Sequence, residues 1–409
     1  MKPAVIAVLF CCLPPLAAIA APWSFDAPLA VTTPPPQTTV FHHLDSSGRR
    51  NIAAADGTVA IAWEDDGDGT PRIYLAHKAY EEARFATALQ VSGANEAFEP
   101  SILALGGKRF AVAWEEDGQV WARLVQIGDA PVPGPLLKIS PASGAQASLA
   151  NDGDGILVVW SEREGRFGRI RALRLGTDGL NLTPGKGCPV DTVPPIDEQL
   201  YPSGAVLQGR LVVAWEDRRP RHTIIMAAIE TKPASCRFSA PVRISAKPPG
   251  RNLPYGAGHG VSRVALDRVG NERLFAAWAD KRDFRHGYDI WGSYYQIGEA
   301  GFEQNEIVQD DFGGLSKQHH AAVAGHDTGT LLVAWDDERE GNVDVMLSWY
   351  EAGGWSDDWP LPGASGPGLQ SNPSVTLDSD GNLHAAWVER DDVDGPTRLK
   401  YGFGRINRE

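Results

Sequence analysis

Histidine, tyrosine and arginine side chains gather in a few irregular segments of this sequence. Seven of the ten histidines occur there, namely His42, His43, His222, His259, His286, His319 and His320. The same segments contain Tyr201, Arg251, Tyr255 and Arg285. An imidazole can accept or donate a proton near neutral pH, and a guanidinium binds a carboxylate through two parallel hydrogen bonds. These residue types indicate a site that holds a polar ligand, transfers a proton, or does both.

Four interpretations of these side chains stay open. They form a binding surface for a glycan, a peptide or a partner protein, or they form an enzyme site in which histidine or tyrosine acts as acid or base and arginine neutralises a substrate carboxylate. A lyase or hydrolase acting on an acidic polysaccharide needs such a set. They form a metal site from His43, His259, His319 or His320 with a carboxylate, or they are loop histidines in solvent. The motifs His-Glu-x-x-His, Gly-x-Ser-x-Gly and Gly-x4-Gly-Lys-Ser/Thr do not occur.

Two acidic turns offer oxygen ligands for Ca²⁺. They are residues 64–69, Glu-Asp-Asp-Gly-Asp-Gly, and residues 390–395, Arg-Asp-Asp-Val-Asp-Gly. Neither has the spacing of an EF-hand, and solvated turns of this composition are common. No motif in the sequence requires a cofactor. Calcium binding at the two acidic turns remains an open alternative.

The elements that must position these groups are revealed by an internal repeat. An apolar block that ends in tryptophan occurs seven times, at Trp63, Trp114, Trp160, Trp215, Trp278, Trp335 and Trp387. The second residue after each tryptophan is always a carboxylate: Asp65, Glu116, Glu162, Asp217, Asp280, Asp337 and Glu389. Because a feature found in every repeat usually holds the repeats together, we expect a structural acid–arginine or acid–backbone bridge, with Arg163, Arg218, Arg282, Arg339 and Arg390 as the nearby cations. The tryptophans, and His384 in the last block, are expected in the core.

Each repeat divides into four short strands separated by Asp/Gly turns. The tryptophan block is the second strand, and it is apolar on both faces, as in a sheet packed between two others. Seven such units predict an all-β, seven-bladed β-propeller with four strands per blade. In this fold the irregular segments meet on one face. The candidate ligand-binding residues are His43, Tyr201, Arg251, Tyr255, His259, Arg285, His286, His319 and His320.

The two ends of the chain predict how the ring closes. The seventh unit stops after its third strand, at residues 400–403. Residues 23–32 near the N-terminus resemble the fourth strands of other units, so we expect them to complete the last blade and cover its edge. Residues 1–20 have the apolar run and small terminal residues of a cleaved export signal. The expected organisation is therefore a signal at 1–20 and a single propeller domain at 21–409, in the periplasm or secreted.

The stretch around Trp335, with the pattern Trp-x-acid-x-Arg followed by Gly and Asp, resembles the repeat of sialidase-superfamily (BNR-like) propellers. The resemblance covers most of the chain after the signal and implies a propeller fold. Sialidases carry Asp boxes of the form Ser-x-Asp-x-Gly-x-Thr-Trp, which do not occur here, and they have six blades. No catalytic residue is therefore transferred.

Charge and cysteine content limit the remaining possibilities. The net charge is -14, which argues against a nucleic-acid surface. Beyond the signal the chain has no segment that would span a membrane, and we expect a monomer. Cys188 and Cys236 are the only cysteines after the signal, and both a disulfide and two free thiols stay open. The expected function is a loop-rich face that binds a glycan or protein partner. The alternative is a glycan-cleaving enzyme, either a sialidase-like hydrolase or a polysaccharide lyase.

Overall fold

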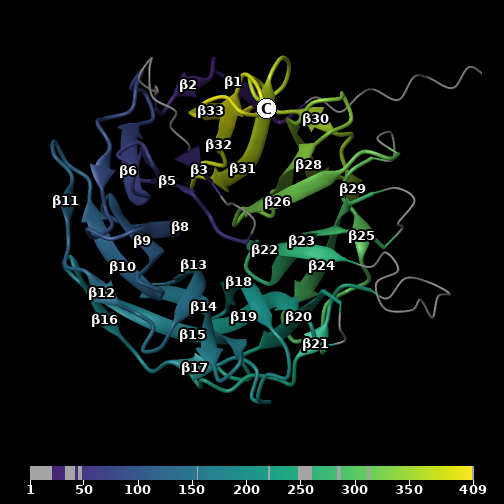
Figure 1. The fold of residues 1–409 in the computed structure, drawn as a ribbon. Coiled ribbons are helices and arrows are strands. Elements are labelled where there is room, and N and C mark those ends of the chain that lie inside the picture. Colours follow the sequence, from purple (N-terminus) through teal and green to yellow (C-terminus); the bar gives the residue numbers. More distant parts are fainter. Residues whose placement is uncertain are drawn as a thin grey trace, which may run out of the picture.

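The computed structural model describes residues 21–32, 42–44, 48–153, 155–219, 222–246, 260–282, 287–310 and 314–407. In this part of the chain the strands form seven antiparallel sheets that follow one another around a ring (Figure 1). The predicted seven-bladed propeller is confirmed. The predicted export signal at 1–20 lies outside the described residues. Among the described residues no helix is long and apolar enough to cross a membrane.

The strands take the same order in every blade, from the centre of the ring outwards. The innermost strands are β3 (His42–His43) with β4 (Ile52–Ala55), β8 (Ala97–Leu105), β13 (Gly144–Asp152), β18 (Gln199–Leu207), β22 (Val261–Val269), β26 (Gln318–Gly325) and β31 (Leu369–Leu377). The second strands are β5 (Thr58–Asp65), β9 (Arg109–Glu116), β14 (Gly155–Glu164), β19 (Arg210–Asp217), β23 (Arg273–Asp280), β27 (Leu331–Asp337) and β32 (Leu383–Arg390).

The outer half of each blade is less regular. The third strands are β6 (Arg72–Ala79), β10 (Gln119–Gln126), β15 (Phe167–Asp178), β20 (Ile224–Ile229), β24 (Asp289–Gln296), β28 (Asp344–Glu351) and β33 (Arg398–Ile406). The fourth strands are short, and several are split in two: β7 (Leu89–Gln90), β11 (Val132–Pro133), β12 (Leu137–Lys138), β16 (Asn181–Pro184), β17 (Cys188–Pro189), β21 (Val242–Arg243), β25 (Glu306–Ile307), β29 (Gly354–Trp355) and β30 (Trp359–Pro360).

The tryptophan blocks form the core because each second strand is covered by sheets on both sides. All seven tryptophans are almost fully buried, with at most 2% of their surface exposed. Burial leaves each indole N–H in need of an acceptor. In six blades this is the carboxylate two residues later, as in the Trp114 Nε1 to Glu116 Oε2 bond of 2.8 Å. The acid in the repeat is therefore structural, as predicted.

The predicted arginine partners of these acids need a correction. Arg339 binds Asp337 through both of its carboxylate oxygens, and Arg282 pairs with Asp280. In blade four the partner is Arg219 rather than Arg218. Arg163 pairs with Glu198, and the Arg390 guanidinium donates to the Val393 carbonyl. In six blades the acid therefore bonds its own tryptophan, and an arginine is added from the following turn or, for Glu162 and Glu389, from the third strand through Arg171 and Arg398.

The N-terminal segment closes the ring as the sequence predicts. Strands β1 (Trp23–Phe25) and β2 (Leu29–Ala30) pair antiparallel with β33 in blade seven and lie beside it in Figure 1. The Trp23 side chain is buried, its indole donates to the Gly381 carbonyl at 2.9 Å, and its ring meets Trp349 edge-on. The two ends of the chain are thus held in one sheet.

Cys188 and Cys236 are joined by a disulfide, with 5.5 Å between their Cα atoms. Cys188 lies on β17 in blade three, and Cys236 lies in the segment before β21 in blade four. The bridge links the outer parts of two neighbouring blades, away from the centre of the ring. Its position assigns it to structure rather than to the central site.

Candidate functional site

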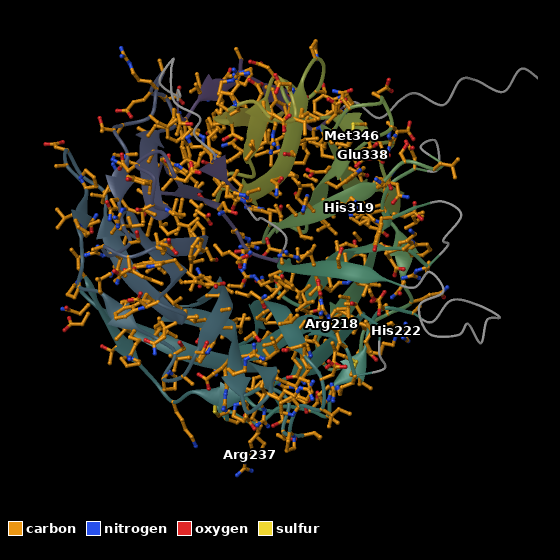
Figure 2. All side chains as sticks on the ribbon, in the orientation of Figure 1. Arg218, His222, Arg237, His319, Glu338 and Met346 are labelled. Carbon is orange, nitrogen blue, oxygen red and sulfur yellow. A yellow bond between two sulfur atoms is a disulfide. The ribbon has the colours of Figure 1, made fainter. Side chains whose placement is uncertain are left out.

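The centre of the ring has two openings, which differ in the loops around them. We call the end where innermost strands begin and second strands end the upper mouth. The lower mouth is the end with the hairpins between first and second strands. The predicted histidine-rich segments that the structure describes belong to the upper mouth. Figure 2 shows His319 in the inner part of blade six, whereas Arg237 projects from the outer edge of the ring.

A bulge at the same position of six innermost strands shapes the upper mouth. The register of each of these strands shifts there, as between Phe98 and Ser101 in β8. A bulge bends its strand and re-aims its side chains. The first bulge residue always has a positive φ of 49 to 60°, which is uncommon outside glycine. These residues are Glu99, Gln146, Tyr201, Arg263, His320 and Asn372.

Carboxylates that directly follow the core tryptophans hold the bulges in place. Each of the four accepts the backbone N–H of the bulge residue in the next blade. The pairs are Glu64 with Glu99, Glu115 with Gln146, Glu216 with Arg263 and Asp336 with Asn372, at 2.5 to 3.2 Å. In blade three, where serine follows the tryptophan, Gln146 Oε1 accepts from Tyr201 instead. A ring of charged and aromatic side chains is thereby fixed around the mouth.

In blade one a longer excursion replaces the bulge, and we call its described residues 48–51 the plug. In blade one these residues lie between the paired His43 and Ile52, whereas only Glu99 and Pro100 separate Phe98 from Ser101 in blade two. Figure 1 shows the purple chain leading into blade one reaching the centre of the ring, close to β22. The Gly48 carbonyl accepts a hydrogen bond from the Ser148 hydroxyl in blade three. The plug therefore crosses the channel.

Glycine is required where the plug turns. Gly48 has a φ of +78°, and a Cβ atom there would lie 2.6 Å from the Val264 carbonyl oxygen in blade five. The next residue, Arg49, is buried, and its Nη1 forms an ion pair with Glu99 Oε2 in blade two at 2.5 Å. The plug thus spans the mouth from blade five to blade two and delivers a guanidinium to a carboxylate.

Glu99 and Glu115 lie together with Arg49. We call the two carboxyl groups, Glu99 and Glu115, the acid pair. Burial, and next the negative charge of Glu99, raise the pKa of Glu115 to about 8, and the two carboxyls hydrogen-bond each other. Arg49 and the Gln146 N–H oppose this shift. Burial also raises the pKa of the neighbouring Glu64. Glu115 therefore holds its proton more strongly than an ordinary glutamate, and the residue is partly exposed.

The structure places four of the nine predicted site residues, and all four are at the upper mouth. His43 is exposed, pairs across the strands with Glu64 and lines a cavity of about 170 Å³ with Asn372 and Arg390. The Arg263 guanidinium lies 3.6 Å from the centre of the Tyr201 ring. His319 and His320 are adjacent on β26. Arg251, Tyr255, His259, Arg285 and His286 lie outside the described residues.

The two neighbouring histidines of blade six have different surroundings. His319 packs against Tyr288 with 4.7 Å between ring centres, and burial lowers its pKa. His320 Nδ1 lies 2.7 Å from Asp336 Oδ2. Tyr201, His319 and His320 thus belong to blades four and six, whereas His43 lies in blade one opposite Glu64, which binds the Glu99 N–H of blade two.

The sequence interpretation missed Glu115, Glu99 and Arg49. It concentrated on the acid two residues after each tryptophan, which bonds the indole. The available signal was the acid one residue after the tryptophan, which occurs in only four repeats. Repetition indicates structure, so departures from the repeat were the better guide.

The structure gives no metal centre in the part of the chain that it describes. No group of three or more histidine, cysteine, aspartate or glutamate side chains there could hold a metal ion. The acidic turns use their carboxylates internally, with Asp65 accepting the Gly67 N–H and Asp392 accepting the Asp394 N–H. Calcium binding at these turns stays a prediction that awaits a direct measurement.

Comparisons with known proteins show the fold. No family model matches the chain, and no curated protein matches its sequence. A polysaccharide lyase, Uly1, is similar in structure with a TM-score of 0.58 and 10% identity, over 88% of this chain and 90% of its own. A protein of unknown function from Dyadobacter fermentans has a TM-score of 0.52 and 11% identity, over 90% and 98% of the two chains. The sialidase resemblance is not among these findings.

Replacing Arg49 by glutamine is expected to raise the pKa of Glu115 further. The guanidinium stabilises the ionised form of the neighbouring carboxyls, so its removal disfavours loss of the proton. Carboxyl ¹³C NMR of selectively labelled glutamate, followed against pH, measures this shift. Arg49→Lys keeps the charge and should restore most of the original value. Arg50→Gln is the matched control, because Arg50 pairs with Asp267 instead. An unchanged Glu115 titration in Arg49→Gln would refute the assigned contact.

Proposed function

We propose that this chain cleaves an acidic polysaccharide by elimination at its upper mouth. The observation that carries the proposal is the position of Glu115, where burial and the adjacent Glu99 raise its pKa to about 8 while the residue stays partly exposed. A polysaccharide lyase shares the ring architecture, which supports a glycan as substrate. The sequence favoured a ligand-binding face and left a glycan-cleaving enzyme as the alternative. The proposal adopts that alternative.

The proposed step needs one base and one acid. In a uronate unit the base removes the proton beside the carboxylate, the released electron pair forms a carbon–carbon double bond, and the bond to the leaving sugar oxygen breaks. His43 is the proposed base, because its imidazole is exposed and His43 pairs across the strands with Glu64, which in turn accepts the Glu99 N–H. Glu115 gives its proton to the leaving oxygen. The proton taken up by His43 returns to Glu115 through water, which restores both groups.

The geometry of the acid pair favours elimination over hydrolysis. Hydrolytic glycosidases use two carboxyl groups held roughly 5 to 9.5 Å apart, with the sugar or a water molecule between them. Glu99 and Glu115 instead hydrogen-bond directly. They therefore act as one unit in which burial and the charge of Glu99 favour the protonated form of Glu115.

The test is a product analysis with purified protein. Pectate, alginate, chondroitin and hyaluronan are supplied as uronate polymers, and arabinan as a neutral polymer. Elimination yields an unsaturated uronate that absorbs in the ultraviolet, with one new reducing end for each cleavage. New reducing ends without ultraviolet absorption would identify a hydrolase and refute elimination. No product from any polymer would leave the binding face as the better interpretation.

A further inference from the structure

A second cavity opens at the lower mouth, on the other side of the plug. Its volume is about 620 Å³, which lies within the range of ~300–1,000 Å³ typical of small-molecule sites. All seven blades contribute to its lining, for example Ala54 in blade one and Thr376 in blade seven. The acid pair and His43 are not part of it. This cavity is therefore a separate space from the proposed reaction site.

The plug closes the inner end of this cavity. The Arg50 carbonyl accepts the Ile102 N–H at 2.8 Å, which fixes the plug against blade two. Arg49 pairs with Glu99 at the upper mouth, whereas the next residue, Arg50, lines the lower cavity. Two consecutive arginines thus serve opposite ends of the channel.

Arg50 presents unused hydrogen-bond donors at this closed end. Its Nη2 lies 2.6 Å from Asp267 Oδ2, and 27% of its side chain remains exposed. A guanidinium has five N–H donors. Within the described residues Asp267 is the only side chain to which the structure bonds it. The remaining edge is suited to a planar carboxylate, which arginine binds through two parallel bonds.

The carboxylates around the cavity already have partners. Asp267 also accepts the N–H groups of Gly325 and Arg268. Asp152 accepts from Arg174 Nε at 2.7 Å. Asp378 accepts from Asn382 and contacts His384. Asp327 pairs with Arg268. Unfilled guanidinium donors are therefore supplied by Arg50 at the closed end and by the more exposed Arg268 beside Asp327.

The walls limit what else a ligand can carry. They combine small side chains and backbone, including Ala54, Ala104 and Gly204, with polar side chains such as Asn151 and Gln208, and His326 is the only aromatic ring among the described lining residues. Such walls fit a small aliphatic body that carries hydroxyl groups, and they offer little for stacking a planar ring. We propose that the lower cavity is a binding site for a small aliphatic carboxylic acid, such as a hydroxy acid or a sugar acid, held by Arg50.

Thermal unfolding with a set of probes tests this site. Acetate, lactate, succinate and glucuronate are compared with acetamide, lactamide and glucose at equal ionic strength. A ligand that binds only the folded protein raises the melting temperature in a saturable way. We expect at least one carboxylate to do so, while its uncharged counterpart does not. No saturable shift with any of the four acids would overturn the proposal.

Two variants locate the binding. Arg50→Gln should weaken the binding of the active probe at least tenfold, whereas Arg49→Gln should leave it unchanged. Ala104→Phe keeps Arg50 and fills the cavity, so it should abolish binding even if Arg50→Gln folds poorly. Binding that survives both Arg50→Gln and Ala104→Phe would refute the assignment. The measurement uses no polysaccharide, so its result is independent of the proposed elimination.

Discussion

Replacing Glu115 by glutamine is expected to lower the rate of polysaccharide cleavage by about 10²- to 10⁴-fold, the usual contribution of a positioned general acid. Glutamine has nearly the same shape and can still accept the Gln146 N–H that now bonds Glu115 Oε1. It cannot give a proton to a leaving oxygen. The loss should therefore appear in kcat, with the melting temperature close to that of the wild type.

The pH dependence gives this prediction a second readout. Cleavage requires the protonated form of Glu115, whose pKa is raised to about 8. Activity in the wild type should fall as the pH rises through that value, while any decline at low pH reports protonation of the base. The residual activity of Glu115→Gln should lack this alkaline decline. A wild-type decline centred near the ordinary glutamate value would contradict the role of Glu115.

Glu216→Gln is a matched control in the same sheet position of blade four. Glu216 also follows a core tryptophan and accepts a bulge N–H, from Arg263. If Glu115 acts only as a clamp, both variants should reduce activity alike. If Glu115 is the proton donor, Glu216→Gln should change the rate by no more than a few-fold.

Removing residues 21–32 is expected to destabilise the whole ring. Blade seven would lose β1 and β2, and the third strand β33 would be left with an open edge. Trp23→Ala isolates the main contribution, because the buried indole fills a cluster with Trp349 and Leu361 and donates to Gly381. Large-to-small changes of a buried tryptophan cost about 3–5 kcal/mol. Chemical denaturation measures the difference in the free energy of unfolding.

Ser24→Ala is the control for this stability prediction. Ser24 is exposed on the same strand, and its hydroxyl bonds only the Asn407 side chain among the described residues. An exposed change of this kind usually alters stability by no more than about 0.5 kcal/mol. If Trp23→Ala proves as mild as Ser24→Ala, the N-terminal strand does not secure the ring.

The architecture could be predicted from the sequence because it repeats. Seven tryptophan blocks, each with its acid two residues later, specify seven second strands that are buried on both faces. The segment at 23–32, which resembles the fourth strands of other units, then predicts how the ring closes. These are local patterns, and each blade must solve the same packing problem. The repeated pattern therefore makes the number and arrangement of the blades visible in the sequence alone.

The site depended on contacts between blades. Glu64 and Glu99, or Glu115 and Gln146, come from neighbouring blades and meet only when the ring closes. The contacts between blades hold the bulge residues at a positive φ. Their backbone conformation therefore could not be predicted from the composition of the sequence. The four described candidates His43, Tyr201, His319 and His320 reached the expected face, since loop position follows from strand order.

The sequence by itself thus determined the number of blades, their core and the partnership of the two chain ends. The tertiary structure decided which charges act together. The plug shows the physical reason: Gly48 touches blade five, Arg49 pairs with blade two, and Arg50 faces the lower cavity, within three consecutive residues. The adjacent residues Arg49 and Arg50 face opposite mouths because the closed ring places a carboxylate partner for each at a different end of the channel.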